Sequence, residues 1–185
     1  MMSRFSDYLH TISHVNDLGN GEKTEWLFHC GMLFSSKDKW WGDFKFRHCV
    51  HEGIDITYYR THPDKIQCFD NSIRVPAMDD GIIVNICDDF LGQTLVVEHK
   101  NSNRSHRQIL FVYAHIIPEK DLKMGLPIQR EDIIARVCDT DKNPLLPPHF
   151  HFSCFEVPQQ IQPGNLDWNL FSKNHEINLI HPVFL

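Results

Sequence analysis

Two histidines separated by one residue, His149 and His151, are the first candidates for chemistry in this chain. They alternate with Phe150 and Phe152, in a pattern typical of a β-strand. Side chains alternate between the faces of a strand, so both imidazoles point to one side, roughly 7 Å apart, and both phenyl rings point into a core. Such a pair suits either two metal ligands or one ligand beside a proton-handling neighbour. The chain has 13 histidines, so other residues must converge on this pair before it indicates a site.

A second candidate is the pair His51 and Asp55. The segment begins like the zincin helix motif His-Glu-x-x-His, but residue 55 is Asp and Gly53 is unfavourable inside a helix. The zincin interpretation therefore fails, and a strand or strand–loop boundary remains. Imidazole and carboxylate are both normal zinc ligands. Alternation along a strand places Glu52 on the opposite face from His51, so we do not expect Glu52 to act as a base.

His115 ends an apolar strand as Tyr113-Ala114-His115, and we expect it to face the same groove as the other candidates. The other nine histidines are expected at surface or hydrogen-bonded positions, with His48 and His99 nearest the groove. The acidic pairs Asp79-Asp80 and Asp88-Asp89 are typical of turns. Core or wall positions are expected for four aromatic residues: Trp40, Trp41, Tyr58 and Tyr59.

The elements that must position these residues are short strands separated by turns. Expected strands cover residues 44–47, 51–56, 72–78, 82–87, 93–99, 108–115, 133–138 and 150–157. A helix is expected within residues 1–18, an exposed hairpin loop at 100–107 and one helical turn at 166–171. Closely spaced strands without long helices predict a mainly β fold, an antiparallel sheet or split barrel with a groove and a short N-terminal helix. Residues 1–43 are expected to pack as an N-terminal segment on a β domain of residues 44–185.

Composition narrows the class of protein. With 185 residues, 42% hydrophobic and 23% charged, the chain suits one globular domain. A net charge of −6 gives no reason to expect nucleic acid as a partner, and no apolar run is long enough to span a membrane. The N-terminus does not resemble a secretory signal, so a cytoplasmic location is expected. The six cysteines are scattered and are expected to be buried, reduced thiols.

The order of the motifs resembles that of the LytM/lysostaphin-type zinc metallopeptidases. His-x-Gly-x-Asp at 51–55, an Asp-Gly turn, Tyr-Ala-His at 113–115 and Pro-His-x-His-Phe at 148–152 follow one another as in that family. The resemblance runs from about residue 46 to residue 157. It implies a duplicated hybrid motif fold, zinc held by His51, Asp55 and His151, and His115 and His149 as catalytic residues that do not bind the metal. It also implies an endopeptidase that cleaves cell-wall (peptidoglycan) peptides by attack of a water that zinc activates.

The sequence departs from that family in three places. The loop at 139–147 lacks the usual Gly, Thr and Ser residues, Ser153 replaces a Glu, and no export signal precedes the domain. A non-catalytic zinc-binding or regulatory peptide-binding module on the same scaffold is therefore the alternative. A phosphoryl carrier is weaker, because a phosphoryl acceptor needs no carboxylate ligand beside it. A further hypothesis is that residues 1–43 restrict access to the metal through His14, Asn16 or Asn20. The oligomeric state is not predicted.

Overall fold

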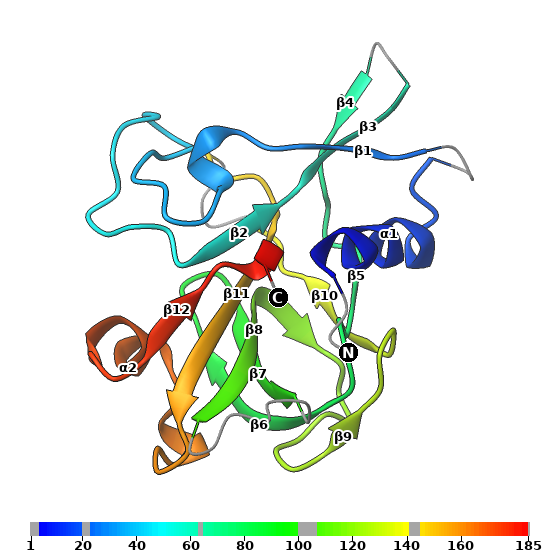
Figure 1. The fold of residues 1–185 in the computed structure, drawn as a ribbon. Coiled ribbons are helices and arrows are strands. Elements are labelled where there is room, and N and C mark those ends of the chain that lie inside the picture. Colours follow the sequence, from blue (N-terminus) through cyan, green and yellow to red (C-terminus); the bar gives the residue numbers. More distant parts are fainter. Residues whose placement is uncertain (1–3, 20–22, 63–64, 100–106, 141–144, 185) are drawn as a thin grey trace.

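In the computed structural model, residues 4–19, 23–62, 65–99, 107–140 and 145–184 are described. An antiparallel sheet of nine strands forms the body of the molecule (Figure 1). Its main path runs in the order β12-β11-β8-β7-β6-β9, while β2 pairs with β11, and β10 pairs with β8 and β5. The bounds are β2 (Gly53–Ile56), β5 (Arg74–Pro76), β6 (Gly81–Asp88), β7 (Gln93–His99), β8 (Arg107–Pro118), β9 (Pro127–Ile128), β10 (Ile133–Val137), β11 (Phe150–Pro158) and β12 (Asn178–Ile180). The predicted mainly β, antiparallel fold is confirmed.

Smaller elements surround this sheet. A three-stranded sheet contains β1 (Glu25–Leu27), β3 (Tyr58–His62) and β4 (Lys65–Gln67). The helices are α1 (Phe5–Val15) and α2 (Trp168–Lys173), with short 3₁₀ turns η1 (Cys30–Met32), η2 (Pro163–Asn165) and η3 (Pro182–Phe184). The short N-terminal helix is thus confirmed, and α2 begins two residues later than the expected helical turn.

Strand β11 occupies the centre of the fold. All nine of its residues are buried, and it pairs with β8, β2 and β12. The strand is buried on both faces although it includes the polar residues His151, Ser153 and Glu156. The pairing places His151 opposite Asp55 of β2 on one side and Ala114 of β8 on the other. Candidate residues that are far apart in the sequence are therefore brought together by strand register.

Helix α1 covers the face of β11 that carries the phenyl rings. Phe5, Tyr8 and Ile12 recur at helical spacing and are buried. The ring of Tyr8 lies 5.4 Å from that of Phe152 and 6.3 Å from that of Phe150, measured between centroids. The Tyr8 hydroxyl donates to Pro76 O, so its polar end is satisfied in the core. Both phenyl rings thus point into the core as predicted, which leaves the opposite face for the histidines.

The expected strand at 44–47 is wrong. Phe44 has φ +53°, a left-handed conformation that interrupts an extended chain, and the segment contributes only a single bridge between Asp38 and Phe46. Phe44 and Phe46 are 63% and 74% exposed, so the face of the segment that was expected to be apolar and buried is in solvent. The alternation of Phe with Lys and Arg therefore does not correspond to a buried and an exposed face of a strand. The hairpin loop at 100–106, the loop at 141–144, Asn20 and His106 lie outside the described residues.

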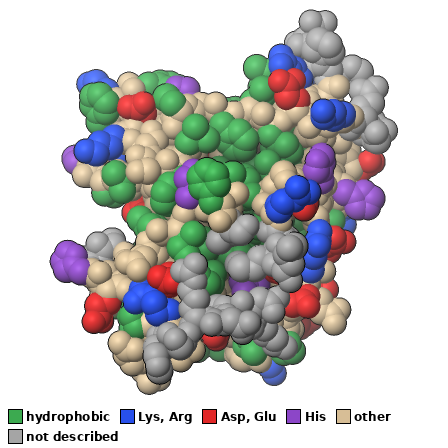
Figure 2. All heavy atoms as spheres, viewed as in Figure 1, with side chains coloured by type: hydrophobic (Ala, Val, Ile, Leu, Met, Phe, Trp, Pro, Cys, Tyr) green, Lys and Arg blue, Asp and Glu red, His purple; other side chains and the backbone are tan. Residues whose placement is uncertain are grey.

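The surface and the thiols add two observations. All six cysteines are free; Cys154 is buried as expected, but Cys30, Cys49 and Cys68 are exposed, which corrects the expectation of buried thiols. On the face shown in Figure 2, basic and acidic side chains are interspersed, and hydrophobic side chains gather toward the middle. No helix within the described ranges has both the length and the apolar character that crossing a membrane requires.

Candidate metal centre and active site

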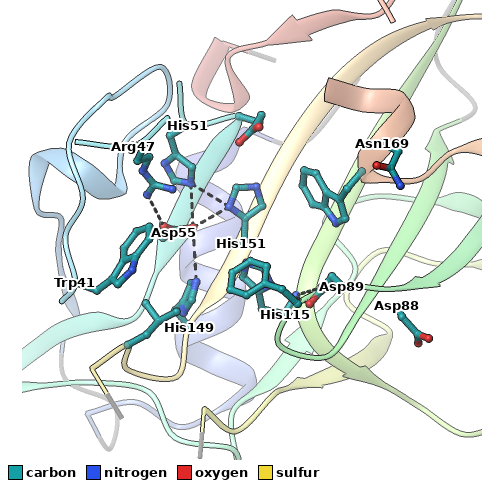
Figure 3. A pocket seen from close by; sticks show the side chains of 14 residues that line it. Trp41, Arg47, His51, Asp55, Asp88, Asp89, His115, His149, His151 and Asn169 are labelled. Carbon is teal, nitrogen blue, oxygen red and sulfur yellow. Dashed lines mark hydrogen bonds and ion pairs between the residues drawn. The ribbon is translucent and has the colours of Figure 1, made fainter. Parts of the chain in front are cut away.

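Three potential ligand atoms converge at the junction of β2 and β11. His51 Nε2 lies 3.1 Å from Asp55 Oδ1 and 3.0 Å from His151 Nδ1, and the latter atom lies 2.8 Å from Asp55 Oδ1 (Figure 3). All three side chains are buried. Tetrahedral ligands at Zn–N and Zn–O distances of 2.0–2.1 Å would be about 3.3 Å apart. The observed spacing is close to this value, so the three atoms could hold one ion.

Gly53 allows the two strands to approach this closely. It pairs with Ser153 across the β2–β11 ladder. A Cβ at this position would lie 2.3 Å from Phe152 O, 2.7 Å from Ser153 Oγ and 2.8 Å from His151 Nε2. The glycine of the His-x-Gly-x-Asp motif is therefore required by close packing against the strand that carries His151.

The two candidate ligand histidines, His51 and His151, are oriented by acceptors on their outer sides. His51 Nδ1 lies 3.1 Å from Leu33 O, and His151 Nε2 lies 2.6 Å from Ser153 Oγ. With a proton on each outer nitrogen, each ring donates to its acceptor and leaves the inner nitrogen with a free lone pair. Such outer hydrogen bonds fix the tautomer of a metal-binding histidine. Ser153, where the resembling family has Glu, takes this part for His151.

Asp55 is held in place by residues that the sequence did not single out for a role in the site. Its Oδ2 accepts hydrogen bonds from Trp40 Nε1 at 2.6 Å and Arg47 Nη2 at 3.3 Å. The Arg47 guanidinium also donates to Gly31 O and Asp38 O. Since Oδ2 faces these donors, Oδ1 remains for the two imidazoles. Trp40 was expected in the core or a wall, and it is buried with its indole N–H on the central carboxylate.

His149 lies beside the ligand cluster and outside its shortest contacts. Its Nδ1 lies 3.0 Å from Pro147 O, so a proton there leaves Nε2 pointing toward Asp55 Oδ1, 4.0 Å away. The ring of His149 is 5.1 Å from that of Trp40 and 4.9 Å from that of His115, measured between centroids. His149 and His115 thus present two further imidazoles to the same pocket.

Asp89 clamps His115 at two points. Its Oδ2 accepts the backbone N–H of His115 at 2.9 Å, and its Oδ1 lies 3.2 Å from His115 Nδ1. His115 has φ +62°, a strained conformation for a residue with a Cβ, and strained residues of this kind are found at functional sites. The Asp88-Asp89 pair does end a strand, since Asp89 also accepts from the N–H groups of Leu91 and Gly92. Its contact with His115 was not anticipated.

Burial and mutual contact set the charges of the cluster. Burial raises the pKa of Asp55, but neighbouring His51 and the hydrogen bonds from His151 and His51 outweigh it, so that pKa lies well below the usual value. Burial lowers the pKa of His149 to about 3 and that of His151 to about 4, although Asp55 favours the charged form of both. His149 and His151 are therefore neutral near pH 7, which is the form in which imidazole binds a metal or accepts a proton.

The metal-free protein is expected to lose stability in acid. The unfolded chain binds protons at histidine near pH 6.5, while folded His149 and His151 bind them only near pH 3 and pH 4. Between these limits the unfolded state holds more protons, so the free energy of unfolding falls as the pH falls. At about 1.4 kcal/mol per pKa unit, we expect a loss of about 2–4 kcal/mol between pH 6.5 and pH 4.5. Urea unfolding at both pH values, with a chelator present, measures this loss.

Two variants control that experiment. His149→Gln should show a smaller loss than the wild type, because one buried titrating group is gone. His10→Gln, at an exposed position on α1, should show the wild-type loss. An unfolding free energy that does not change between the two pH values contradicts the interpretation.

The cluster opens into a pocket of about 550 Å³. His51, Asp55, His115, His149 and His151 all line it. In Figure 3, Trp41 and Arg47 lie at one end, and Asp88 and Asn169 at the other. Side chains at both ends leave the space above the imidazoles for a ligand.

Three expectations about this pocket are wrong. Glu52 lines it together with His51, because β2 begins only at Gly53 and strand alternation does not extend back to Glu52. His48 is exposed and is not among the residues that line the pocket. His99 is buried elsewhere, with Nδ1 2.7 Å from Asp80 O and its ring 3.9 Å from that of Phe111.

The N-terminal segment reaches the site by a different route from the one suggested. His14 and Asn16 do not line the pocket; the Asn16 amide donates to Ile12 O and Arg74 O. Residues of this segment that do reach it include Trp40, whose indole N–H donates to Asp55, Trp41, which lines the pocket, and Leu33, whose carbonyl oxygen contacts His51. The positions of His14 and Asn16 do not support the hypothesis that these residues restrict access to the metal site.

No family model matches this sequence, and no curated protein shows a significant match. Several solved structures do match this chain. The fold is similar to that of lysostaphin. That match has a TM-score of 0.48 and 14% identity and covers 78% of this chain and 46% of lysostaphin. Csd3 from Helicobacter pylori matches with a TM-score of 0.43 and 20% identity, and the match covers 77% of this chain and 33% of Csd3. LytU matches with a TM-score of 0.44 and 18% identity, and the match covers 77% of this chain and 84% of LytU.

The chain thus spans about a third of Csd3 and under half of lysostaphin.

Proposed function

We propose that the chain is a zinc-dependent endopeptidase acting on peptides of the cell-wall (peptidoglycan) type. The observation that carries this proposal is the convergence of His51 Nε2, Asp55 Oδ1 and His151 Nδ1 in a pocket that two further imidazoles also line. Three protein ligands of the His/His/Asp kind leave a position open, which is the pattern of a catalytic rather than a structural zinc site. The cell-wall substrate rests on the resemblance of the motifs.

The residues of the chain divide the work between binding and proton transfer. His51, Asp55 and His151 would hold the ion, and zinc in such a site activates water and polarises a carbonyl. His149 is neutral and its Nε2 points at the cluster, so it is placed to take a proton from the attacking water. His115, with Nδ1 held by Asp89, presents Nε2 to the same pocket and is placed to donate a proton to the leaving amine. The Asp89 carboxylate fixes the orientation of the His115 ring for this role.

Zinc-dependent hydrolysis tests the proposal. Purified protein should release new amino termini from peptidoglycan fragments, lose this activity with a chelator and regain it when zinc is restored. Liquid chromatography with mass spectrometry identifies the bond that is cut. The His149→Ala variant loaded with zinc is the control, because it keeps the proposed ligands. Stoichiometric zinc binding with no hydrolysis of any peptide would favour the non-catalytic module instead, and no zinc binding would contradict both.

A further inference from the structure

Aromatic side chains stand along the pocket beside the candidate site. This aromatic wall consists of Trp41, Phe90 and Trp168, all of which line the pocket. The Phe90 ring lies 4.6 Å from that of His115 and the Trp168 ring 5.5 Å from that of His151, measured between centroids. At the other end, the Arg47 guanidinium lies 4.4 Å above the Trp41 ring. A peptide bound across the site would therefore contact apolar surface.

Phe90 is the exposed member of this wall. It is 71% exposed, although its ring rests against a buried histidine. The turn that carries it is fixed, because Asp89 Oδ1 accepts from the N–H groups of Leu91 and Gly92, both at 2.8 Å, and Asp89 N–H donates to Gly92 O. A large aromatic side chain on a rigid turn can bury surface on binding without a further loss of backbone freedom. Phe90 thus has the properties of a preformed contact for an apolar group.

The charges around the pocket are unfavourable for an acidic ligand. Glu52 and Asp88 line it, and Arg47 is the only Lys or Arg among the described residues that do so. The Arg47 guanidinium is occupied by Asp55, Gly31 O and Asp38 O. A carboxylate on the ligand close to this surface would be repelled by like charges.

We propose that one of the two substrate residues that flank the scissile bond carries an apolar side chain in contact with Phe90, and that this residue is not acidic. This inference rests on the proposed function. A glycine at that position would leave the phenyl ring in water, whereas a Leu or Phe side chain would bury it. Removing both apolar surfaces from water favours binding of the larger side chain. The groove therefore selects peptides by hydrophobic contact beside His115.

A matched series of peptides tests this inference. The two positions that flank the cleaved bond are occupied in turn by Gly, Leu or Glu, and kcat/KM is measured for each. We expect the Leu peptide at one of the two positions to exceed its Gly counterpart by at least about tenfold and the Glu peptide to be the poorest. In Phe90→Ala, the ratio of Leu to Gly kcat/KM should fall about tenfold. Phe184→Ala removes an equally exposed phenyl ring outside the pocket, 81% exposed, and should keep the ratio.

The outcomes separate this inference from the proposed function. Equal kcat/KM for Gly and Leu peptides at both positions, or an unchanged ratio in Phe90→Ala, overturns the hydrophobic contact while leaving the peptidase intact. If the wild type cleaves no peptide, the proposed function fails, and calorimetric binding of the same peptides to the chelated protein decides the contact by itself. Tighter binding of Leu than of Gly peptides that is lost in Phe90→Ala supports it, and equal binding overturns it.

Discussion

Replacing His151 with Ala is expected to abolish zinc binding, whereas replacing His149 with Ala leaves zinc bound and lowers turnover about 100-fold or more. The two residues are two positions apart, yet only His151 places a nitrogen within 3.0 Å of both other ligand groups. His149 Nε2 is 4.0 Å from Asp55 Oδ1 and its ring is oriented by Pro147 O. Loss of one of three protein ligands removes the geometry that an ion requires, but loss of a proton-handling side chain does not.

Paired measurements of zinc content and peptide hydrolysis on each variant check this result. Elemental analysis after dialysis gives the metal content, and competition with a chromogenic chelator gives the affinity. His10→Ala, at an exposed position on α1, is the control for loss of a histidine. Loss of zinc from His149→Ala with retention by His151→Ala would mean that the two roles are exchanged. Retention of zinc and activity by both variants would contradict the assignment of this site.

The second large effect concerns Asp89 and His115. His115→Ala is expected to lower turnover by about 100-fold or more, and Asp89→Asn by about 10-fold to 100-fold, with zinc affinity unchanged in both. Asp89 holds the backbone N–H and Nδ1 of His115, so it acts through that histidine. The amide of Asn keeps one acceptor oxygen, but its NH2 group cannot replace the second one and it carries no negative charge. Asp89→Asn should therefore have little further effect once His115 is absent.

A double-mutant cycle with kcat and KM measured separately tests this coupling. The single changes should lower kcat and leave KM nearly unchanged, and the double variant should resemble His115→Ala. Asp70→Asn is the matched control, because Asp70 also caps a turn, accepting from Ser72 N–H, but lies outside the pocket. Additive losses in the double variant would show that Asp89 supports only the turn. Nuclear magnetic resonance of the His115 ring, which reports its tautomer, should change in Asp89→Asn.

Local patterns in the sequence predicted most strands of the large sheet, but not β9 or β12, and the residues that meet in the pocket. The alternation of His149 and His151 with Phe150 and Phe152 predicted the central strand and the opposite faces of its imidazole and phenyl side chains. The motif order predicted that His51, Asp55, His115, His149 and His151 share one groove, and the structure brings these five side chains together. Their roles as ligands or catalysts stay predictions.

The supporting residues could not be predicted in the same way. Trp40 and Asp55 are 15 positions apart, and Asp89 and His115 are 26 apart, so no periodicity connects either pair. Glu52 was misplaced because strand alternation was applied from residue 51, two residues before β2 begins at Gly53. A pair of carboxylates after a β-branched strand was the available signal for Asp89, but it indicates a turn equally well.

The ligand cluster joins segments that are distant along the chain: 96 positions separate Asp55 from His151, and 100 separate His51 from His151. A contact of this span closes a long loop, and the entropy of the unfolded chain opposes it. The three candidate ligands therefore meet only when β2 is paired with β11, which requires that most of the chain has been synthesised. An ion held there would act as a cross-link between the two strands, stabilising the native state in the way a disulfide does, by excluding extended unfolded conformations.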